Sequence, residues 1–365
     1  MSKIVLFLAN KDNVLYNFRS EVILRIKDLG YEVVLCCPYG KKIDFFTKRG
    51  CKFIHIDMDR RGTSLVKDIQ LISRYNRIFK KIRPDIVLTY TSKPSIYGGF
   101  LCGIKNIPYI INNAGLMEVS GPFEIFMKFL YKLGFSKASC IMYQNTRERD
   151  YVNKIVGNKV HFRDIPGSGV NLSNFSYKEY PRNDDLIIFN YVARIVKFKG
   201  IDELIECAKI IKQKYNNVRF VIFGDFDDEH YRVKIKELEK KGIVEYGGVQ
   251  VDMKPFITAA HAAIHPSYYE GMTNVVLEHS SMGRPCIGSN IPGVKEGIDD
   301  GKTGFLFEPK NVGSMVEAVE KFLSLTHDEK SCMGIQARLK MEREFSRDIV
   351  IDAYSEEIRK NIGKA

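Results

Sequence analysis

The sequence predicts an α/β protein with two doubly wound parallel sheets, one in each half of the chain. Short apolar runs that indicate buried strands alternate with amphipathic helical patterns along most of the chain. This alternation is typical of parallel sheets covered by helices. It pauses over residues 166–185, where prolines, glycines and an acidic stretch indicate a linker between two domains.

The first domain is expected over residues 1–165, where apolar runs and helical patterns follow one another in regular order. Each apolar run is short enough for a strand of a parallel sheet, and each helical pattern is long enough to cross over it. Strands are expected at 3–9, 32–37, 52–56, 86–90, 109–111 and 140–143, and helices at 18–29, 41–49, 64–82, 95–104, 122–136 and 146–156.

The second domain is expected over residues 186–345, where the same alternation restarts. Strands are expected at 186–193, 218–223, 243–246, 262–265 and 285–288, and helices at 201–215, 229–241, 252–259 and 273–283. A final helical pattern occupies roughly residues 346–363, within a C-terminal segment 346–365.

Composition excludes several protein classes. A chain of 365 residues with 45% hydrophobic and 27% charged residues is long and apolar enough for two globular cores. The eight cysteines form no C-x-x-C pair, which favours free thiols over a disulfide framework or a zinc site. The first apolar run is too short for a signal-peptide core, and no run of about 18 apolar residues follows. We therefore expect a chain that is neither secreted by a signal peptide nor membrane-spanning.

Positive charge is concentrated in the first half. Residues 1–180 hold 29 Lys and Arg against 15 Asp and Glu, whereas the rest of the chain holds 27 against 29. Such asymmetry indicates that one half meets an anionic partner, for which an anionic bilayer and nucleic acid are the candidates, with plain solubility as the alternative. The helical stretch 122–137 mixes Phe with Lys128, Lys132 and Lys137, and this pattern fits a core helix or a membrane-docking helix equally well.

The segment between Glu270 and Glu278 is the strongest candidate site. A buried strand ends at Pro266, a loop carries Glu270, and a helix starts near Asn274 and Val275 with Glu278 about one turn inside. Backbone amides at a helix N-terminus favour an anion. Two carboxylates beside an anion site suit the hydroxyls of a sugar nucleotide whose phosphates contact the amides. The alternative is one surface acid and one acid on a helix face.

Several motifs in this half resemble the donor-binding half of family 4 glycosyltransferases. They are Ala193-Arg194 with Lys199-Gly200, Glu270-Gly271 with Glu278, Gly283-Arg284-Pro285, Gly293-Val294-Lys295-Glu296 and Gly301-Lys302-Thr303-Gly304. The resemblance implies the GT-B architecture, in which two Rossmann-like doubly wound domains face a central crevice and the last helix crosses back to the first domain. It also implies a retaining transfer that needs no bound metal.

The resemblance assigns roles to individual residues of the second half. Arg194 and Lys199, which follow a strand, would hold the donor diphosphate. Glu270, beside Gly271, would contact the transferred sugar, and Glu278 would contact the ribose. The amides of Asn274 and Val275 would stabilise the departing diphosphate. Asp225 and Asp227 match a D-x-D metal motif but follow a strand and Gly224, so we interpret them as a solvent-facing turn, and we interpret His265 as a packed strand residue.

Motifs in the first half resemble a narrower group. These motifs are Tyr16-Asn-Phe18-Arg19, Thr91-Ser-Lys93-Pro94 and Asn112-Asn-Ala-Gly115-Leu116. They are similar to those of transferases that act on undecaprenyl-diphosphate-linked acceptors in bacterial surface-glycan assembly. Arg19 and Lys93 are expected to face the acceptor diphosphate, with simple surface charge as the alternative. The group's Gly-Leu-Gly becomes Gly115-Leu116-Met117 here, which puts the close approach of that loop in doubt.

These observations together predict a metal-independent glycosyltransferase at the cytoplasmic face of the membrane. Its donor would be a nucleotide sugar, with UDP as the expected nucleotide, and its acceptor a polyprenyl-diphosphate-linked glycan. A nucleotide-sugar epimerase of the same architecture is the alternative. Nucleic-acid binding is not expected, because the chain lacks a recognisable nucleic-acid motif and contains no Trp.

Overall fold

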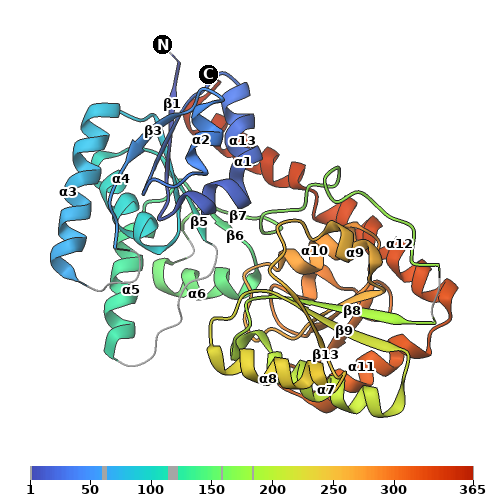
Figure 1. Cartoon of the computed structure of the whole chain (residues 1–365). Helices are drawn as coiled ribbons and strands as arrows, with labels where there is room; N and C mark the ends of the chain where they lie inside the picture. The colour runs from blue at the N-terminus through green and yellow to red at the C-terminus, as the bar shows by residue number, and fades with distance from the viewer. Residues whose placement is uncertain (1, 60–63, 114–121, 158, 183–184, 365) are drawn as a thin grey trace. The chain divides into compact units, whose positions relative to one another are not determined.

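The computed structural model describes residues 2–59, 64–113, 122–157, 159–182 and 185–364 (Figure 1). The chain forms two compact units. The first unit comprises Met1–Ser168 together with Asp348–Ala365, and the second comprises Gly169–Arg347. Residues 169–185 of the expected linker therefore belong to the second unit, and the last residues of the chain belong to the first.

The first unit contains a seven-stranded sheet in the order β3-β2-β1-β4-β5-β6-β7. All neighbouring strands run parallel, as expected from the alternating pattern. The chain builds one side of the sheet from β1 and then the other side from β4, so the boundary between β1 and β4 is the topological switch point. The strands are β1 (Ile4–Leu8), β2 (Glu32–Cys37), β3 (Lys52–His55), β4 (Ile86–Tyr90), β5 (Tyr109–Asn113), β6 (Cys140–Tyr143) and β7 (Phe162–Asp164).

Helices cover both faces of this sheet, because successive residues of a buried strand point to opposite sides. One face packs against α1 (Asp12–Asp28), α2 (Ile43–Thr47) and α13 (Arg347–Ile362) (Figure 1). The other face packs against α3 (Leu65–Ile82), α4 (Gly99–Lys105), α5 (Pro122–Phe135) and α6 (Thr146–Val156). A π-helical turn, Pro94–Gly98, precedes α4.

The second unit contains a six-stranded parallel sheet in the order β10-β9-β8-β11-β12-β13. Its switch point lies between β8 and β11. The strands are β8 (Ile187–Val192), β9 (Val218–Phe223), β10 (Glu245–Gly248), β11 (Ala262–His265), β12 (Cys286–Ser289) and β13 (Gly304–Phe307).

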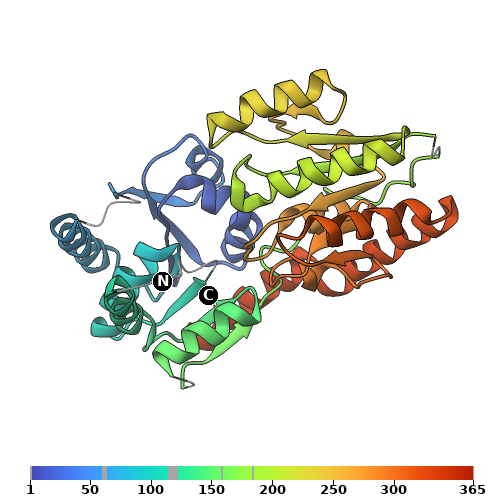
Figure 2. The same ribbon diagram turned by 90° about the horizontal axis from the view of Figure 1, so that it is seen from below.

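Helices α7, α8 and α11 lie side by side on one face of the second sheet (Figure 2). Helix α10 packs on the opposite face, through Val276, against Ala263 of β11 and Cys286 of β12. The helices of this unit are α7 (Ile201–Lys214), α8 (Glu229–Lys240), α9 (Lys254–Ala259), α10 (Asn274–Ser281), α11 (Val312–Ser324) and α12 (His327–Glu344), with short 3₁₀ turns at Lys197–Lys199 and Lys295–Gly297.

A buried arginine joins three segments of the second unit. The Arg284 side chain is fully buried, and its guanidinium donates hydrogen bonds to the backbone carbonyls of Lys178, Glu179, Ile257, Thr258, Met282 and Gly283 at 2.8–3.3 Å. Burial lowers the pKa of Arg284 to about 10, so the guanidinium stays charged at neutral pH. The Gly283-Arg284-Pro285 motif is therefore part of the scaffold.

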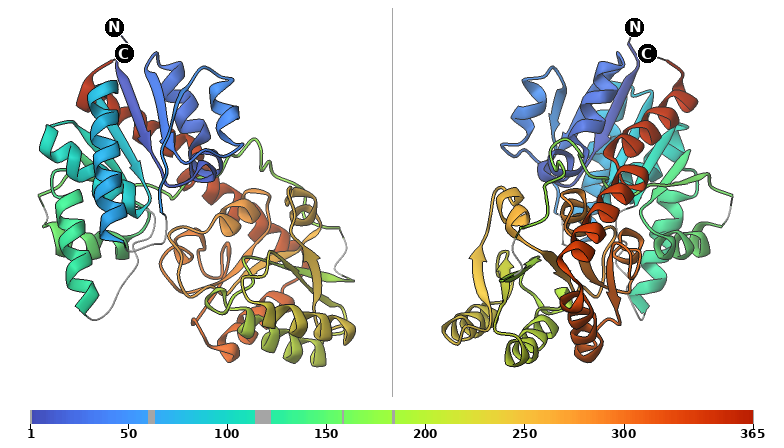
Figure 3. Two further views of the ribbon diagram at one scale, coloured as in Figure 1. Left: turned by 60° about the vertical axis from the view of Figure 1, so that its left-hand side comes forward. Right: turned by 90° about the vertical axis from the view of Figure 1, so that its right-hand side faces the viewer.

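Helix α13 ends beside the start of the chain. The Lys3 ammonium donates hydrogen bonds to the carbonyls of Ile362 and Lys364, and the Tyr31 hydroxyl donates to that of Gly363. Figure 3 shows the two chain ends close together in both views. These contacts fasten the C-terminal segment to the residues that directly precede β1 and β2.

Some elements were missed or misplaced by the sequence pattern. Strand β7 is a three-residue edge strand with two charged residues, and β13 begins within a glycine-rich motif, so neither has an apolar run long enough to be recognised. Helix α1 starts at Asp12, six residues before the expected start, because its polar first turn hides the helical period. Helices α11 and α12 were not predicted either. None of the helices within the described residues is long and apolar enough to cross a bilayer.

Candidate functional site

The candidate residues of the second unit gather at its topological switch point. Arg194 and Lys199 follow β8, His265 is the last residue of β11, and Glu270 lies in the loop after β11. All strands of this sheet are parallel, so these residues lie at the edge where the strands end. Ligands of open α/β sheets bind outside the carboxyl ends of the strands at this position.

Glu270 accepts two contacts on one carboxylate oxygen. The Lys199 Nζ lies 2.5 Å from Glu270 Oε1, and the His265 Nε2 lies 2.9 Å from the same oxygen. All three side chains are largely buried: the exposed fraction is 15% for Lys199, 3% for His265 and 14% for Glu270. The structure therefore joins two residues predicted for different parts of the donor, and it adds His265 to them.

The Glu270 carboxylate is ionised at all ordinary pH values. Burial by itself raises the pKa of Glu270, but the hydrogen bond and charge of His265, with the charge of Lys199, outweigh burial and lower it to about 2. A charged acceptor with one engaged oxygen and a small exposed surface is suited to accept further hydrogen bonds from hydroxyl groups.

Backbone contacts hold the Lys199 loop against the Glu270 loop. The Tyr268 amide donates to the Phe198 carbonyl at 2.9 Å. Gly200 has a φ of 73°, and a Cβ on it would lie 2.1 Å from the carbonyl oxygen of Pro266. Glycine is therefore needed there for two reasons, the left-handed backbone and the close approach. This explains why a glycine follows Lys199.

Glu278 differs from Glu270 because its carboxylate has no hydrogen-bond or ion-pair partner among the described residues. It lies on α10 and is only partly exposed. Burial raises the pKa of Glu278 to about 7, although the positive charge of Arg347 acts in the opposite direction. An unpartnered, partly buried carboxylate at the protein surface is poised for a ligand.

The N-terminus of α10 offers amides that have no acceptor among the described residues. The first N–H groups of a helix lack intrahelical acceptors, and the N-cap residue Thr273 makes no side-chain capping hydrogen bond. Asn274 and Val275 are the first two residues of this helix, as the sequence predicted. Their amides, together with the helix dipole, form a site suited to an anion.

The Gly293 loop supports the loop that precedes α10. The Thr273 amide donates to the Gly293 carbonyl at 2.9 Å, and the Gly293 amide donates to the Glu296 carboxylate at 2.7 Å. A Cβ on Gly293 would lie 2.5 Å from the carbonyl oxygen of Gly271 and 2.6 Å from that of Glu270. The Gly293-to-Glu296 motif therefore fixes the backbone at Glu270 and Gly271.

Arg194 forms an ion pair with Asp227 and lies over the Phe198 ring, 5.4 Å from its centroid. The Arg194 side chain is 54% exposed and that of Asp227 is 40% exposed. Asp225 is also exposed, so both aspartates lie on the surface, as the interpretation of a solvent-facing turn requires. The contact between Asp227 and Arg194 was not foreseen.

Arg19 lies inside the first unit. It is 2% exposed, and its guanidinium donates to Asn112 Oδ1 at 2.7 Å and to Ser168 Oγ at 2.9 Å. The rings of Tyr90 and Tyr354 lie 5.8 and 5.6 Å from its centre. The guanidinium faces neutral groups, and in this structure it has almost no exposed surface for a diphosphate.

Lys93 is also engaged within the first unit. Its Nζ lies 2.6 Å from Asp68 Oδ1, and the Tyr97 hydroxyl donates to the other Asp68 oxygen at 2.7 Å. The Lys93 side chain is 15% exposed. The third residue expected here, Gly115, lies outside the described residues.

Two residues of the second-unit site were missed by sequence reasoning. His265 is buried, as expected of a packed strand residue, but it also contacts Glu270. The sequence signal that could have indicated this contact is the position of His265 at a strand end, five residues before Glu270. Arg347 lies far from Glu278 in sequence, and no short spacing indicates their proximity.

Family models and relatives match both halves of the chain. The model for glycosyl transferases group 1 matches residues 174–340, and the model for glycosyl transferase 4-like proteins matches residues 4–145. The capsular polysaccharide biosynthesis glycosyltransferase CapM of Staphylococcus aureus is 26% identical over 349 residues, which cover 90% of this chain and 89% of the relative. The UDP-Gal:alpha-D-GlcNAc-diphosphoundecaprenol alpha-1,3-galactosyltransferase of Escherichia coli is 28% identical over 312 residues, which cover 79% of each chain.

A solved structure supports the same conclusion for the fold. The glycosyltransferase from Rickettsia africae ESF-5 aligns over 100% of both chains with a TM-score of 0.82 at 18% identity. The matched families are transferases, which decides against the epimerase alternative. The two family models together cover the residues of both sheets, so the predicted GT-B fold is confirmed. The chain belongs to the GT-B glycosyltransferases, and its glycosyl transferase 4-like half is followed by its group 1 half.

Proposed function

We propose that this glycosyltransferase moves a sugar from a uridine diphosphate donor to a polyprenyl-diphosphate-linked glycan during the assembly of a bacterial surface polysaccharide. The contact of Lys199 and His265 with one oxygen of Glu270 carries the donor half of this proposal. The acceptor half rests on the names of the relatives in Staphylococcus aureus and Escherichia coli.

Lys199 would bind the donor diphosphate from its position beside Glu270. The ammonium has three donors, and one contact with Glu270 leaves others for phosphate oxygens. The same contact keeps Glu270 ionised and fixed, so the carboxylate can accept hydrogen bonds from hydroxyls of the transferred sugar. His265 holds Glu270 from the buried side. Arg194 would add a second cation, exchanging Asp227 for phosphate when the donor binds.

The α10 segment would bind the nucleoside end and the departing phosphate. The Glu278 carboxylate has no hydrogen-bond or ion-pair partner among the described residues, and it would accept hydrogen bonds from the two hydroxyls of the ribose. The amides of Asn274 and Val275 would face the diphosphate, which gains negative charge as the sugar leaves. Fixed donors aimed at developing charge lower the barrier of such a step.

We further propose that the transfer is retaining and needs no metal. Arg194, Lys199 and the α10 amides would supply the positive charge that a divalent ion supplies elsewhere. Turnover should then survive excess EDTA, and the product should keep the anomeric configuration of the donor. A loss of turnover that magnesium or manganese restores would refute metal independence and make Asp225 and Asp227 candidate ligands.

The lipid-linked acceptor requires the enzyme to work at a membrane surface, and α5 fits this task. One face of α5 lies in the core of the first unit through Tyr131 and Phe135. Its other face exposes apolar side chains, with Ile125 76% and Phe129 56% exposed. The core alternative therefore applies to one side of this stretch, and the exposed apolar side is the one that we propose for docking.

A basic pocket lies beside this exposed face. It has a volume of about 270 Å³ and is lined by Lys128, Phe129, Lys132, Tyr151, Lys154 and Ile155 of α5 and α6. Lysines beside exposed apolar side chains suit the headgroup region of an anionic bilayer. We therefore propose that α5 and α6 dock on the cytoplasmic surface of the membrane.

The activity can be tested with the full chain and defined substrates. Thermal shift against a panel of UDP- and GDP-sugars should show stabilisation by UDP-sugars. The stabilising donor, incubated with a short polyprenyl-diphosphate-linked N-acetylhexosamine, should give a lipid-linked disaccharide. Without acceptor, the donor sugar should not be interconverted. Stabilisation by GDP-sugars alone, or transfer to free sugars but never to the lipid-linked acceptor, would contradict the proposal.

A further inference from the structure

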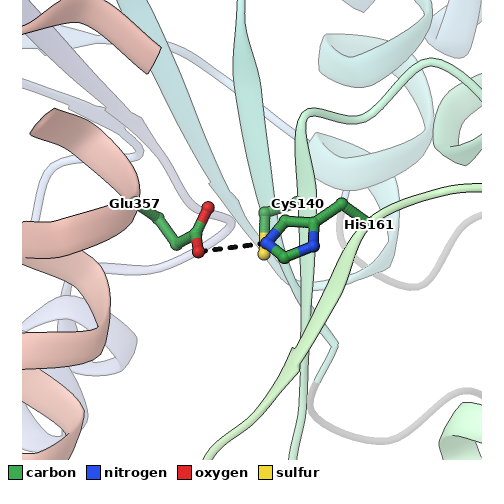
Figure 4. Close-up of side chains that lie close together, drawn as sticks. All are labelled: Cys140, His161 and Glu357. Atoms are coloured by element: carbon green, nitrogen blue, oxygen red, sulfur yellow. Dashed lines mark hydrogen bonds and ion pairs between the residues drawn. The ribbon is translucent and has the colours of Figure 1, made fainter. Parts of the chain in front are cut away.

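Three side chains of different chemistry meet at one edge of the first sheet. Cys140 is the first residue of β6, His161 directly precedes β7, and Glu357 lies on α13 (Figure 4). One ligand atom from each lies within 4.8 Å of the other two. The His161 Nε2 is 3.1 Å from Glu357 Oε1. The proposed donor site uses none of these residues.

The Glu357 carboxylate is incompletely paired in this cluster. Glu357 is 5% exposed, and its second oxygen, Oε2, is buried without a hydrogen-bond partner among the described residues. Buried carboxylate oxygens are normally paired, because removing them from water without a partner is unfavourable. The free oxygen is therefore an unexplained feature that a bound cation would account for.

The ligand types fit zinc. Thiolate, imidazole and carboxylate are the groups that bind Zn²⁺, at about 2.3, 2.0–2.1 and 2.0–2.2 Å. A tetrahedral ion at these distances separates its ligand atoms by about 3.3–3.8 Å. The separation of His161 from Glu357 is already close to this range, and small side-chain rotations would bring Cys140 into it. The His161 side chain is 45% exposed, which leaves a path from solvent.

The ligand atoms, more than the surrounding charges, select the kind of ion. The Arg163 Nη1 is 2.6 Å from Glu356 and 4.0 Å from Glu357, and Lys360 also acts on Cys140. These cations oppose any divalent ion, so binding must come from strong bonds to the ligand atoms. A thiolate ligand favours Zn²⁺ over hard ions such as Ca²⁺ or Mg²⁺, and a thiolate with a carboxylate neutralises its charge.

We propose that Cys140, His161 and Glu357 form a zinc site that fastens α13 to the β6–β7 edge of the first sheet. A water molecule on the exposed side of His161 would take the fourth position, with Glu357 Oε2 as a second, longer contact of the same carboxylate. The site is structural, and no step of sugar transfer passes through it. Its ligands lie 21 and 196 residues apart in sequence, which is why the cysteine spacing gave no zinc motif.

The test is zinc binding by the full chain, prepared without a histidine tag and stripped with a chelator. After addition of Zn²⁺ and gel filtration, elemental analysis should find one zinc per chain. Co²⁺ should give the near-ultraviolet charge-transfer band of a cobalt–thiolate bond. Zinc should also raise the Tm. Cys140→Ser, His161→Gln and Glu357→Gln should each weaken zinc binding at least tenfold, as measured by competition with a zinc-sensitive dye.

Two matched variants control for chance binding. Cys332→Ser removes the exposed thiol, and His55→Gln removes an exposed histidine of the same unit. Both should bind zinc as the wild type does. His161→Gln decides the case if Cys140→Ser does not fold, because its side chain is partly exposed. Wild-type protein that retains no zinc, or His161→Gln protein with unchanged affinity and an unchanged cobalt band, would overturn the proposal.

Discussion

The two sheets of this protein have the same design, but their switch points differ in what they offer a ligand. In the second unit, the Lys199–Glu270 pair and the unpartnered Glu278 keep some exposed surface, and free amides of α10 lie next to them. In the first unit, Arg19 is enclosed by Asn112, Ser168 and two tyrosine rings, and Lys93 is held by Asp68.

The difference shows that a cation near a strand end is not by itself a binding residue. Its partners decide whether the charge is available. Arg19 contacts neutral groups on several sides, so its charge serves the packing of the first unit. Among the exposed lysines of that unit, Lys132 and Lys154 lie instead around the pocket between α5 and α6. We expect substitutions in the second unit to change donor binding. Substitutions in the first unit should change stability or membrane binding.

The largest effect is expected from Lys199→Ala. Loss of a fixed cation that stabilises the departing diphosphate should lower kcat by about 10²–10³. Lys197→Ala, in the same loop but exposed, is the matched control and should stay within a few-fold of the wild type. Steady-state kinetics with saturating donor measures both. Equal losses in the two variants would mean that the loop responds to any charge change, and Lys199 would lose its assigned role.

Glu278→Gln should weaken donor binding at neutral to alkaline pH by about ten- to a hundred-fold, because a charge-assisted hydrogen bond contributes about 1.5–3 kcal/mol. Isothermal titration with UDP measures the effect. Glu206→Gln, at an exposed α7 residue that pairs with Lys209, should leave binding unchanged. Wild-type affinity in Glu278→Gln would remove the ribose contact from the proposal.

The pH dependence of donor binding should follow Glu278. Its pKa of about 7 in the folded protein means that lowering the pH from about 8 to about 6 protonates the carboxylate. Donor affinity should therefore fall over this range, and Glu278→Gln should flatten the profile. The contribution of Glu278 to stability depends on pH in the opposite direction, because the folded state holds the proton more tightly than the unfolded chain. That contribution rises as the pH falls from about 7 toward 4.5.

Arg19→Met should reduce stability and leave donor affinity unchanged. The substitution removes the donors for Asn112 and Ser168 and should lower the free energy of unfolding by about 1–3 kcal/mol. Urea denaturation measures this change, with Arg25→Met on the exposed side of α1 as the control. A variant of wild-type stability that binds the lipid-linked acceptor weakly would show instead that Arg19 reaches the acceptor.

The smallest individual effects are expected at the docking surface. Lysines near an anionic bilayer contribute about 1 kcal/mol each, so Lys132→Ala and Lys154→Ala should each weaken binding to anionic vesicles roughly fivefold. Binding should also fall with salt. Vesicle binding should weaken further when Lys128, Lys132 and Lys137 are all replaced by Glu. Replacing Lys80 and Lys81 on α3 by Glu should weaken vesicle binding less. Equal losses from both sets would indicate a diffuse charge effect without a docking helix.

Much of the architecture could be predicted because it depends on local patterns. Strands such as Val218–Phe223 and Ala262–His265 were placed correctly from their apolar runs. The short edge strand Phe162–Asp164 could not be predicted, since only its pairing with β6 makes it a strand. The electrostatic effect of Arg347 on Glu278 depends on tertiary structure, and so does the burial of Arg19.

The buried Arg284 guanidinium has a consequence for how the second unit folds. Its six carbonyl acceptors come from residues 178–179, 257–258 and 282–283, so a charged group loses its water only when all three segments are in place. Partial assembly would leave a dehydrated cation without acceptors. The amides of these segments should therefore exchange with deuterium together, in one cooperative opening. In Arg284→Lys, which has three donors and no planar fork, the segments should exchange at separate rates.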